Sequence, residues 1–266
     1  MTETALRGLR ATGLALACAV VPPLARADLQ DEIQVYDDAI NRPGERGLEL
    51  HVNTTPRGRS VPDYPGEIVP RHALRVTPEF SLGLTPTLEA GLYLPTILRP
   101  DGRYESAGAK LRLKWLPLQP GEGGGAFGGV NVELSRLAQR YSQSRVSMET
   151  RFIAGWRSRD WLLVVNPTLE FGLSDGFGGH RPELTTGVKV ARRVGDGVAA
   201  GVEYYRTSGP LARSLPWQQQ DNRIYLALDI DHEPWAFNIG VGYGLTPGSD
   251  RWTLKTIIDI PLPQSR

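Results

Sequence analysis

A regular alternation of large apolar residues with polar or small ones constrains the fold of this chain more than any other feature. In "RIYLALDIDHEPWAFNIGVGYG", residues 223–244, every second residue from Ile224 to Ile230 is large and apolar, and the same parity resumes from Trp235 to Tyr243. The positions between them carry mainly charged residues, alanine and glycine. A period of two residues is typical of β-strands. The stretch therefore predicts two neighbouring strands that place their bulky apolar groups on one face.

The same period recurs along most of the chain and predicts about twelve strands of about ten residues each. Besides the two strands above, the alternating segments are 48–55, 74–84, 88–94, 109–115, 130–134, 146–156, 161–171, 184–190, 198–204 and 252–262.

The polar face of these strands is unusual, because it carries charges of both signs together with many glycines. A soluble β-sandwich also alternates, but its apolar faces share one core, and glycine within a strand weakens it. Strands of about ten alternating residues are typical of outer-membrane barrels, which face lipid outside and a polar lumen inside. Such a sheet must close, because lipid tolerates no open edge. The sequence therefore predicts an all-β fold, a closed antiparallel up-and-down transmembrane β-barrel, in preference to a soluble sandwich or a lipocalin-like fold.

The connections between the predicted strands agree with a barrel. They tend to alternate between longer segments, such as 56–70 and 206–222, and short ones, such as 85–87 and 231–234, with a long exception at 116–126. Longer loops of such barrels are extracellular and short turns periplasmic, so both ends of the barrel chain are expected in the periplasm. Aromatic residues at strand ends predict two belts at the membrane interfaces. They are Trp115, Trp156, Trp161, Trp235, Tyr243 and Trp252.

The first 27 residues predict a cleaved secretory signal peptide. Arg7 and Arg10 precede an apolar run, and the segment closes with small residues around Arg26, as a signal peptidase site does. Cys18 is the only cysteine, so the mature chain has no structural disulfide. We divide the chain into a signal peptide (1–27), an acidic leader (28–46) that either hangs in the periplasm or plugs the lumen, and the transmembrane barrel (47–266). The expected location is the outer membrane of a Gram-negative bacterium.

Charge and hydropathy exclude two classes of protein. The chain has 30 basic and 29 acidic residues, which become 27 and 28 when Glu3, Arg7, Arg10 and Arg26 of the signal peptide are removed. This balance gives no electrostatic reason for nucleic acid binding. The mean hydropathy of −0.27 and the lack of another long apolar run argue against a helical membrane protein.

The inward parity carries the residues expected to line the lumen. They are Glu49, His51, Arg75, Glu79, Glu89, Lys110, Arg112, Lys114, Glu133, Glu149, Arg151, Glu170, Glu183, Lys189, Glu203, Arg223, Asp229, Lys255 and Asp259. The basic series at 110–114 is expected to face Glu89 on one neighbouring strand and Glu133 on the other, because opposite charges stabilise strand pairing. Two interpretations stay open. The charges either pair in a closed lumen, since unpaired buried charge is costly, or line a narrow aqueous channel with clearance along Gly240–Gly244.

Two stretches resemble a known family. "DEIQVYDDAINRPGERGLELHVN" at 31–53, and "WLLVVNPTLEFGL" at 161–173, are similar to uncharacterised Gram-negative outer-membrane β-barrels, akin to the barrels named as phenol-degradation-pathway (MetA-type) transporters. The resemblance runs over the mature chain and implies a transport barrel. The chain ends "IIDIPLPQSR", without the terminal aromatic residue that the barrel-assembly machinery reads in many such proteins.

The leading hypothesis is thus a narrow channel for passive passage of small solutes. One alternative is a membrane-embedded lipid-modifying enzyme, for which His51 is the best candidate base although no serine signature accompanies it. Another is a structural or partner-binding barrel with a closed lumen, recognised through loops 56–70 and 206–222. No catalytic residue, metal or cofactor is expected, and "DIDHE" at 229–233 is interpreted as a turn. Expected partners are outer-membrane lipid, the barrel-assembly machinery and a small-molecule solute.

Overall fold

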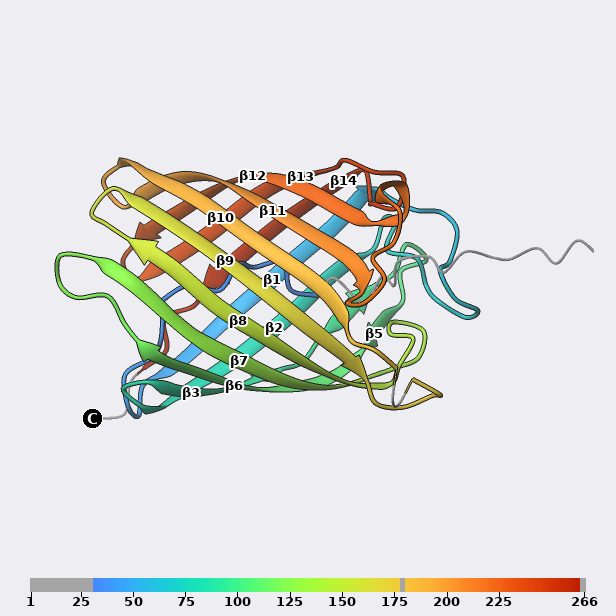
Figure 1. Cartoon of the computed structure of the whole chain (residues 1–266), viewed down its shortest axis with the longest axis horizontal. Coiled ribbons are helices and arrows are strands. Elements are labelled where there is room, and N and C mark those ends of the chain that lie inside the picture. The colour runs from blue at the N-terminus through green and yellow to red at the C-terminus, as the bar shows by residue number, and fades with distance from the viewer. Residues whose placement is uncertain (1–30, 178–179, 264–266) are drawn as a thin grey trace, which may run out of the picture.

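The computed structural model of the chain describes residues 31–177 and 180–263, so the predicted signal peptide lies outside the described residues. One antiparallel sheet closes on itself as a 12-strand barrel, because β1 pairs with both β2 and β14 (Figure 1). The predicted fold class is confirmed. The ring consists of β1 (Arg46–Arg57), β2 (Leu74–Thr85), β3 (Leu88–Tyr93), β6 (Gly108–Leu118), β7 (Gly125–Leu137), β8 (Val146–Arg157), β9 (Trp161–Gly172), β10 (Glu183–Gly195), β11 (Val198–Pro210), β12 (Asp221–His232), β13 (Trp235–Gly244) and β14 (Trp252–Asp259).

The two ends of the barrel differ in their connections. At one end, which we call the turn end, consecutive strands are joined by short segments: 86–87, 119–124, 158–160, 196–197 and 233–234. At the other, the loop end, the connections are mostly longer: 58–73, 94–107, 138–145, 173–182, 211–220 and 245–251. The connection 94–107 contains a small hairpin, β4 (Thr96–Leu98) and β5 (Tyr104–Ser106), and β4 continues the pairing of β3 with β2. A short 3-10 helix, η1 (Trp217–Gln219), lies in 211–220.

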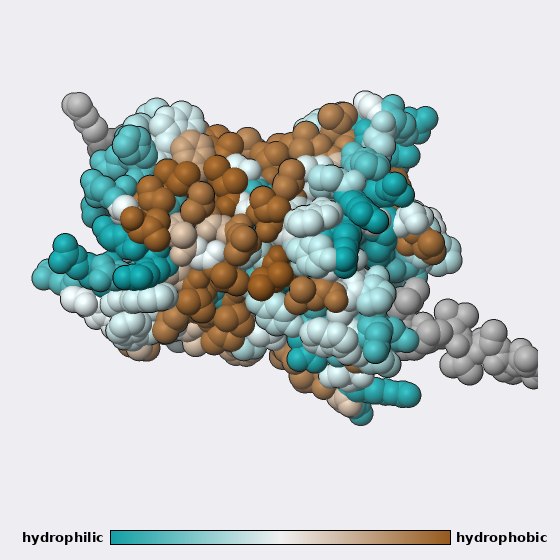
Figure 2. All heavy atoms as spheres, turned by 90° about the horizontal axis from the view of Figure 1, so that it is seen from above, coloured by the Kyte–Doolittle hydropathy of each residue, from teal (hydrophilic) through white to brown (hydrophobic). Residues whose placement is uncertain are grey.

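The large apolar side chains of the alternation point outward. Leu226, in the middle of β12, is 70% exposed, and the outward apolar residues of the other strands are exposed or half-buried. Figure 2 shows apolar residues as a brown band across the middle of the face in view, with teal hydrophilic residues toward both ends. No helix within 31–177 or 180–263 is long and apolar enough to cross a membrane. Of the predicted interface aromatics, the five tryptophans are exposed and Tyr243 is half-buried against Trp252.

Two connections are more ordered than the sequence predicts. The segment 116–126 was expected to be an unusually long turn, but β6 continues to Leu118 and β7 begins at Gly125 across a break in register. The remaining turn, 119–124, is tightened by a hydrogen bond from Gly124 N to Gly121 O of 2.9 Å. The hairpin β4–β5 was also not predicted. Its strands have three residues each, too few for a period of two to be recognised.

Inward glycines make room for large neighbouring side chains. A Cβ added at Gly242 would lie 2.3 Å from the ring of Tyr225, and one at Gly240 would lie 2.9 Å from Lys255. A Cβ at Gly155 would likewise lie 2.2 Å from the ring of Phe127. The clearance predicted along Gly240–Gly244 is therefore wrong, because inward side chains of adjacent strands occupy that space.

The outward position of Leu226 allows a test of what surrounds the barrel. In a lipid bilayer, Leu226→Arg at mid-strand should destabilise the barrel by about 2–4 kcal/mol, whereas Leu118→Arg at the turn end of β6 should cost about 0–1 kcal/mol. Denaturant unfolding of both variants in phospholipid vesicles measures the difference. Equal, near-zero effects at the two positions would show that water, not lipid, contacts the belt.

Candidate functional site

The lumen contains the leader, which we define from here on as the described residues 31–45. Asp31, Ile33, Val35 and Tyr36 are each at most 4% exposed. The leader runs along the barrel axis. Asp31 O accepts a hydrogen bond from Asn53 on β1, whereas the Asn41 side chain donates to Ser81 Oγ near the turn end of β2. The leader thus lies inside the barrel before the chain enters β1 at the turn end.

The leader is held largely through its backbone. Asn166 on β9 makes two hydrogen bonds to Tyr36, accepting from its backbone N at 2.7 Å and donating to its backbone O at 3.0 Å. Lys255 Nζ donates to Ile33 O at 3.0 Å, and Lys114 Nζ donates to Ala39 O at 2.6 Å. These contacts come from β9, β14 and β6, so the leader is attached to widely separated parts of the wall.

Acidic side chains of the leader pair with cations of the wall. Asp31 contacts Lys110 at 2.8 Å, and Glu32 lies 3.6 Å from Arg151. Asp37 and Asp38 both contact Arg157 near the turn end of β8, at 3.1 and 2.6 Å. The pairs of Lys110 and Arg151 are poorly exposed to solvent, whereas Arg157 is more exposed. Charge-assisted hydrogen bonds of this kind are stronger than those between neutral groups.

Tyr36 is the central side chain of the leader. Its hydroxyl lies 2.5 Å from that of Tyr93 on β3. The guanidinium of Arg151 sits 4.3 Å from the centre of its ring, and Lys114 Nζ sits 5.1 Å from the same centre, both within the range of cation–π attraction. Val35 beside it packs with inward apolar residues, including Ala191 and Val164. Sequence periodicity could have found Tyr93 and Asn166, which share the inward parity, but the irregular leader has no such signal.

The wall charges pair among themselves as well. Arg112 Nη2 contacts Glu79 at 2.6 Å and Glu89 at 2.7 Å, and Lys110 lies 3.4 Å from Glu133. The basic series of β6 thus meets glutamates on β3 and β7, on the two sides that the sequence indicated. On the opposite wall, Lys189 contacts Asp229 at 2.8 Å.

The structure places the residues expected to line the lumen at three levels of exposure. Most are buried: His51, Arg75, Glu79, Glu89, Lys110, Arg112, Lys114, Glu133, Glu183, Lys189, Glu203, Arg223 and Lys255. The half-buried ones are Glu49, Glu149, Arg151, Glu170 and Asp229, and Asp259 is exposed at the turn end.

With the leader in place, the middle of the lumen is filled. Arg75, Tyr93, Asn131, Tyr225 and Lys255 project inward from five strands around the ring, and none is more than 1% exposed. A continuous aqueous path would expose such side chains to water. In this conformation, the leader and the inward side chains together close the barrel at this level.

A cavity of about 1020 Å³ remains at the turn end. It lies between the leader and the wall formed by β9 to β14 and β1, and its mouth is formed by the turns 158–160, 196–197 and 231–233. Its lining is mostly acidic, with nine carboxylates (Asp37, Glu49, Asp160, Asp196, Glu203, Asp229, Asp231, Glu233, Asp259) and five Lys or Arg residues (Arg157, Arg159, Lys189, Arg193, Lys255).

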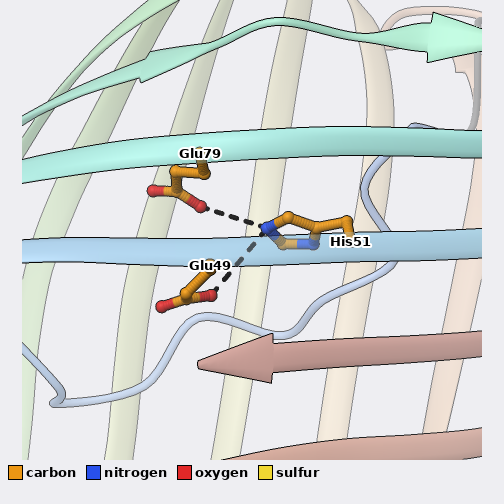
Figure 3. A group of neighbouring side chains, drawn as sticks. All are labelled: Glu49, His51 and Glu79. Atoms are coloured by element: carbon orange, nitrogen blue, oxygen red, sulfur yellow. Dashed lines mark hydrogen bonds and ion pairs between the residues drawn. The ribbon is translucent and has the colours of Figure 1, made fainter. Parts of the chain in front are cut away.

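Glu49, which lines this cavity, converges with His51 and Glu79 on the lumen face of β1 and β2 (Figure 3). His51 Nε2 lies 3.1 Å from Glu79 Oε2 and 3.8 Å from Glu49 Oε2. His51 is fully buried, and the polar partners found for its ring within the described chain are these two carboxylates. No serine, threonine or cysteine nucleophile is among them, so the geometry gives the enzymatic hypothesis for His51 no support.

Ion pairs also tie the loop end together. Arg59 in 58–73 contacts Asp63, Glu67 at 3.4 Å and Asp250 at 3.9 Å, and so joins this loop to the last one. Burial by itself would lower the pKa of Arg59. The three carboxylates raise this pKa by more than burial lowers it, so the pKa lies above its usual value. In 173–182, hydrogen bonds from Arg145 and Ser174 lower the pKa of Asp175. These loops are therefore fixed to one another and to strand ends.

The attachment of the leader can be tested at Asn166. Asn166→Leu removes both hydrogen bonds to Tyr36 and leaves its buried backbone N and O without these partners, at a cost of about 1–3 kcal/mol for each group. We expect proteolysis or amide exchange of the leader to accelerate at least about tenfold. Asn131→Leu is the matched control, since the Asn131 side chain is buried on β7 without a hydrogen-bond partner among the described residues. Equal protection of the leader in both variants would contradict its attachment through Asn166.

Comparisons with known proteins show the fold. No protein-family model matches the chain, and no curated protein matches it in sequence. Among solved structures, it is similar to the COG4313 outer membrane channel from Pseudomonas putida F1 (TM-score 0.55, 13% identity, 86% of this chain and 99% of that one). It is also similar to the KdgM porin, solved also in complex with disordered oligogalacturonate (0.53, 7%, 82% and 99%), and to the NanC porin (0.52, 10%, 81% and 100%). The chain therefore has the barrel fold found in these outer-membrane porins and channels.

Proposed function

We propose that this protein is an outer-membrane channel for passive passage of small solutes, and that the leader closes its lumen. The observation that carries the proposal is the leader inside the barrel, attached by Asn166, Lys255, Lys114 and Arg157. A wall with a polar interior needs water or polar groups to solvate it. The leader supplies such groups in the closed state, and water would supply them in the open state.

The leader contacts suit a removable segment. Most are hydrogen bonds and ion pairs between one segment without regular secondary structure and the barrel wall. Each of these contacts can be replaced by a contact with water as the leader leaves. The barrel itself is closed by the backbone pairing of β1 with β2 and with β14. The leader takes no part in this pairing. Withdrawal of the leader therefore leaves the barrel intact and its polar lumen open.

The surroundings of the channel follow from the same fold. The outward belt supports contact with outer-membrane lipid, and the difference between turn end and loop end supports a periplasmic position for the turns and the leader's exit. Export through a cleaved signal peptide and insertion by the barrel-assembly machinery belong to this proposal. The KdgM complex with oligogalacturonate and the sequence resemblance to MetA-type transporters both support passage of a small solute.

A disulfide that locks the leader tests the proposal directly. Val35 Cγ2 lies 3.4 Å from the position that a Cβ would take at Gly187 on β10, so Val35→Cys and Gly187→Cys can be joined with little rearrangement. The mature chain has no other cysteine, because Cys18 lies in the predicted signal peptide. In planar bilayers, we expect the oxidised double variant to be closed and the reduced one to open as the wild type does.

Two controls make the result decisive. Gly187→Cys alone should conduct identically with and without reductant, and Asn166→Leu should open more often than the wild type because its leader is held less tightly. Conductance of the oxidised double variant equal to that of the reduced one would contradict the leader as the closing element. Absence of conductance from the reduced variant, the wild type and Asn166→Leu alike would contradict the channel itself.

A further inference from the structure

Three carboxylates lie side by side across neighbouring strands of the barrel wall. Glu49 on β1 is directly opposite Glu79 on β2 and directly opposite Asp259 on β14. Like charges in this arrangement destabilise a sheet unless a cation lies between them. Glu49 Oε2 is buried without a hydrogen-bond partner among the described residues, and the ion pair found for it is the 3.8 Å contact with His51. The row therefore lacks a cation at its centre.

The geometry of the cluster is close to that of a metal site. Figure 3 shows the Glu49 and Glu79 carboxylates both directed toward Nε2 of His51. The three potential ligand atoms lie within 4.8 Å of one another, and the two pairs that include Nε2 measure 3.1 and 3.8 Å. Ligands at about 2.0–2.2 Å from a tetrahedral zinc ion are separated by about 3.3 Å. A modest rotation of Glu49, the most exposed of the three, would complete that spacing.

We propose that Glu49, His51 and Glu79 bind one divalent metal ion of the zinc class in the lumen wall. One imidazole and two carboxylates are a donor set that zinc accepts, with water in the fourth position. Arg112 already contacts Glu79, whereas no ion pair with a lysine or arginine is found for Glu49 within the described residues, so a dipositive ion would supply the missing positive charge beside Glu49. No metal was expected from the sequence, in which Glu79 lies on a different strand from Glu49 and His51.

The groups around the cluster leave the three ligand atoms available. Arg112 contacts the Oε1 atom of Glu79 at 2.6 Å, so the Oε2 atom stays directed at His51. Such fixing of a ligand carboxylate by a neighbouring hydrogen bond is usual around bound metals. Lys114, the other nearby cation, is engaged with Ala39 O of the leader. When Nε2 binds the metal, Nδ1 of the same ring carries the proton.

The cavity gives an ion a path to the site. Glu49 and Asp259 belong to its lining, which carries nine carboxylates against five Lys or Arg residues. A cleft with such an excess of one sign of charge concentrates counter-ions from solution. Metal ions entering at the turn end would therefore reach Glu49 first and His51 and Glu79 behind it. The site does not depend on the channel activity proposed above.

Titration of the folded mature chain in detergent with Zn²⁺ and with Co²⁺ tests the site. We expect one ion per chain by calorimetry and a visible absorption spectrum of low-symmetry Co²⁺. We also expect weaker binding at acid pH, because protons compete for His51 Nε2. Glu49→Gln and His51→Ala should each weaken binding at least about tenfold, since each removes one of three protein ligands. Asp259→Asn is the matched control. It removes one charge from the same row but no ligand, and its affinity should stay within about threefold of the wild type.

Each outcome bears on the proposal. Electrophoresis of boiled and unboiled samples checks folding, because a folded barrel migrates differently before and after boiling. If His51→Ala does not fold, the isosteric variant Glu49→Gln tests the site by itself. Absence of stoichiometric binding to the wild type overturns the site. Unchanged affinity in Glu49→Gln overturns it too, and an equal loss in Asp259→Asn would show general attraction of cations to the cavity. Metal binding without any conductance would leave the site standing and contradict only the channel.

Discussion

The pairing of polar groups inside a wall that lipid surrounds is the constraint on which this structure depends. The period of two sends most bulky apolar side chains of the strands outward, as the exposure of Leu226 shows, and so most of the strand charges lie inside. Buried charges are tolerated only when they are paired and hydrogen-bonded. Arg112 between two glutamates, and Lys110 between Glu133 and Asp31, are the local solutions. The leader takes part in the second of these, so it belongs to the electrostatics of the barrel.

The barrel could be predicted from the sequence because lipid imposes a simple rule on each strand. Alternation alone gave the fold class, the inward parity and most strand bounds to within a few residues. It failed where the rule does not apply. The ends of β6 and β7 beside the turn 119–124 contain glycine and proline, so the alternation could not be recognised there. The strands of the hairpin β4–β5 are too short to show a period. The glycines of β13 were misinterpreted because the sequence does not show which neighbouring side chain covers a glycine, here Tyr225 and Lys255.

The candidate site was less predictable, because it depends on contacts that side-chain identity does not encode. The leader is held at Ile33, Tyr36 and Ala39 through backbone atoms, which every residue possesses. Two of the three residues in the proposed metal site, Glu49 and His51, could be placed on one face from their spacing of two. The third, Glu79, joins them only through the register between β1 and β2, and a connection of the length of 58–73 does not reveal that register.

The energetics of the leader bear on the proposal that this segment both fills the lumen and leaves it. Each of its polar contacts contributes about 1 kcal/mol net, because the alternative is a contact with water rather than none. Fixing each residue costs about 1–2 kcal/mol of conformational entropy. Burial of Val35 and Tyr36 adds to the contributions that favour docking. The net free energy of docking is the difference between these opposing contributions, so loss of a few contacts would shift the population of the docked leader. The strands have no such freedom, because unpairing them would expose their backbone groups to lipid. Inside the barrel, the leader is thus an element that can exchange its contacts with the wall for contacts with water.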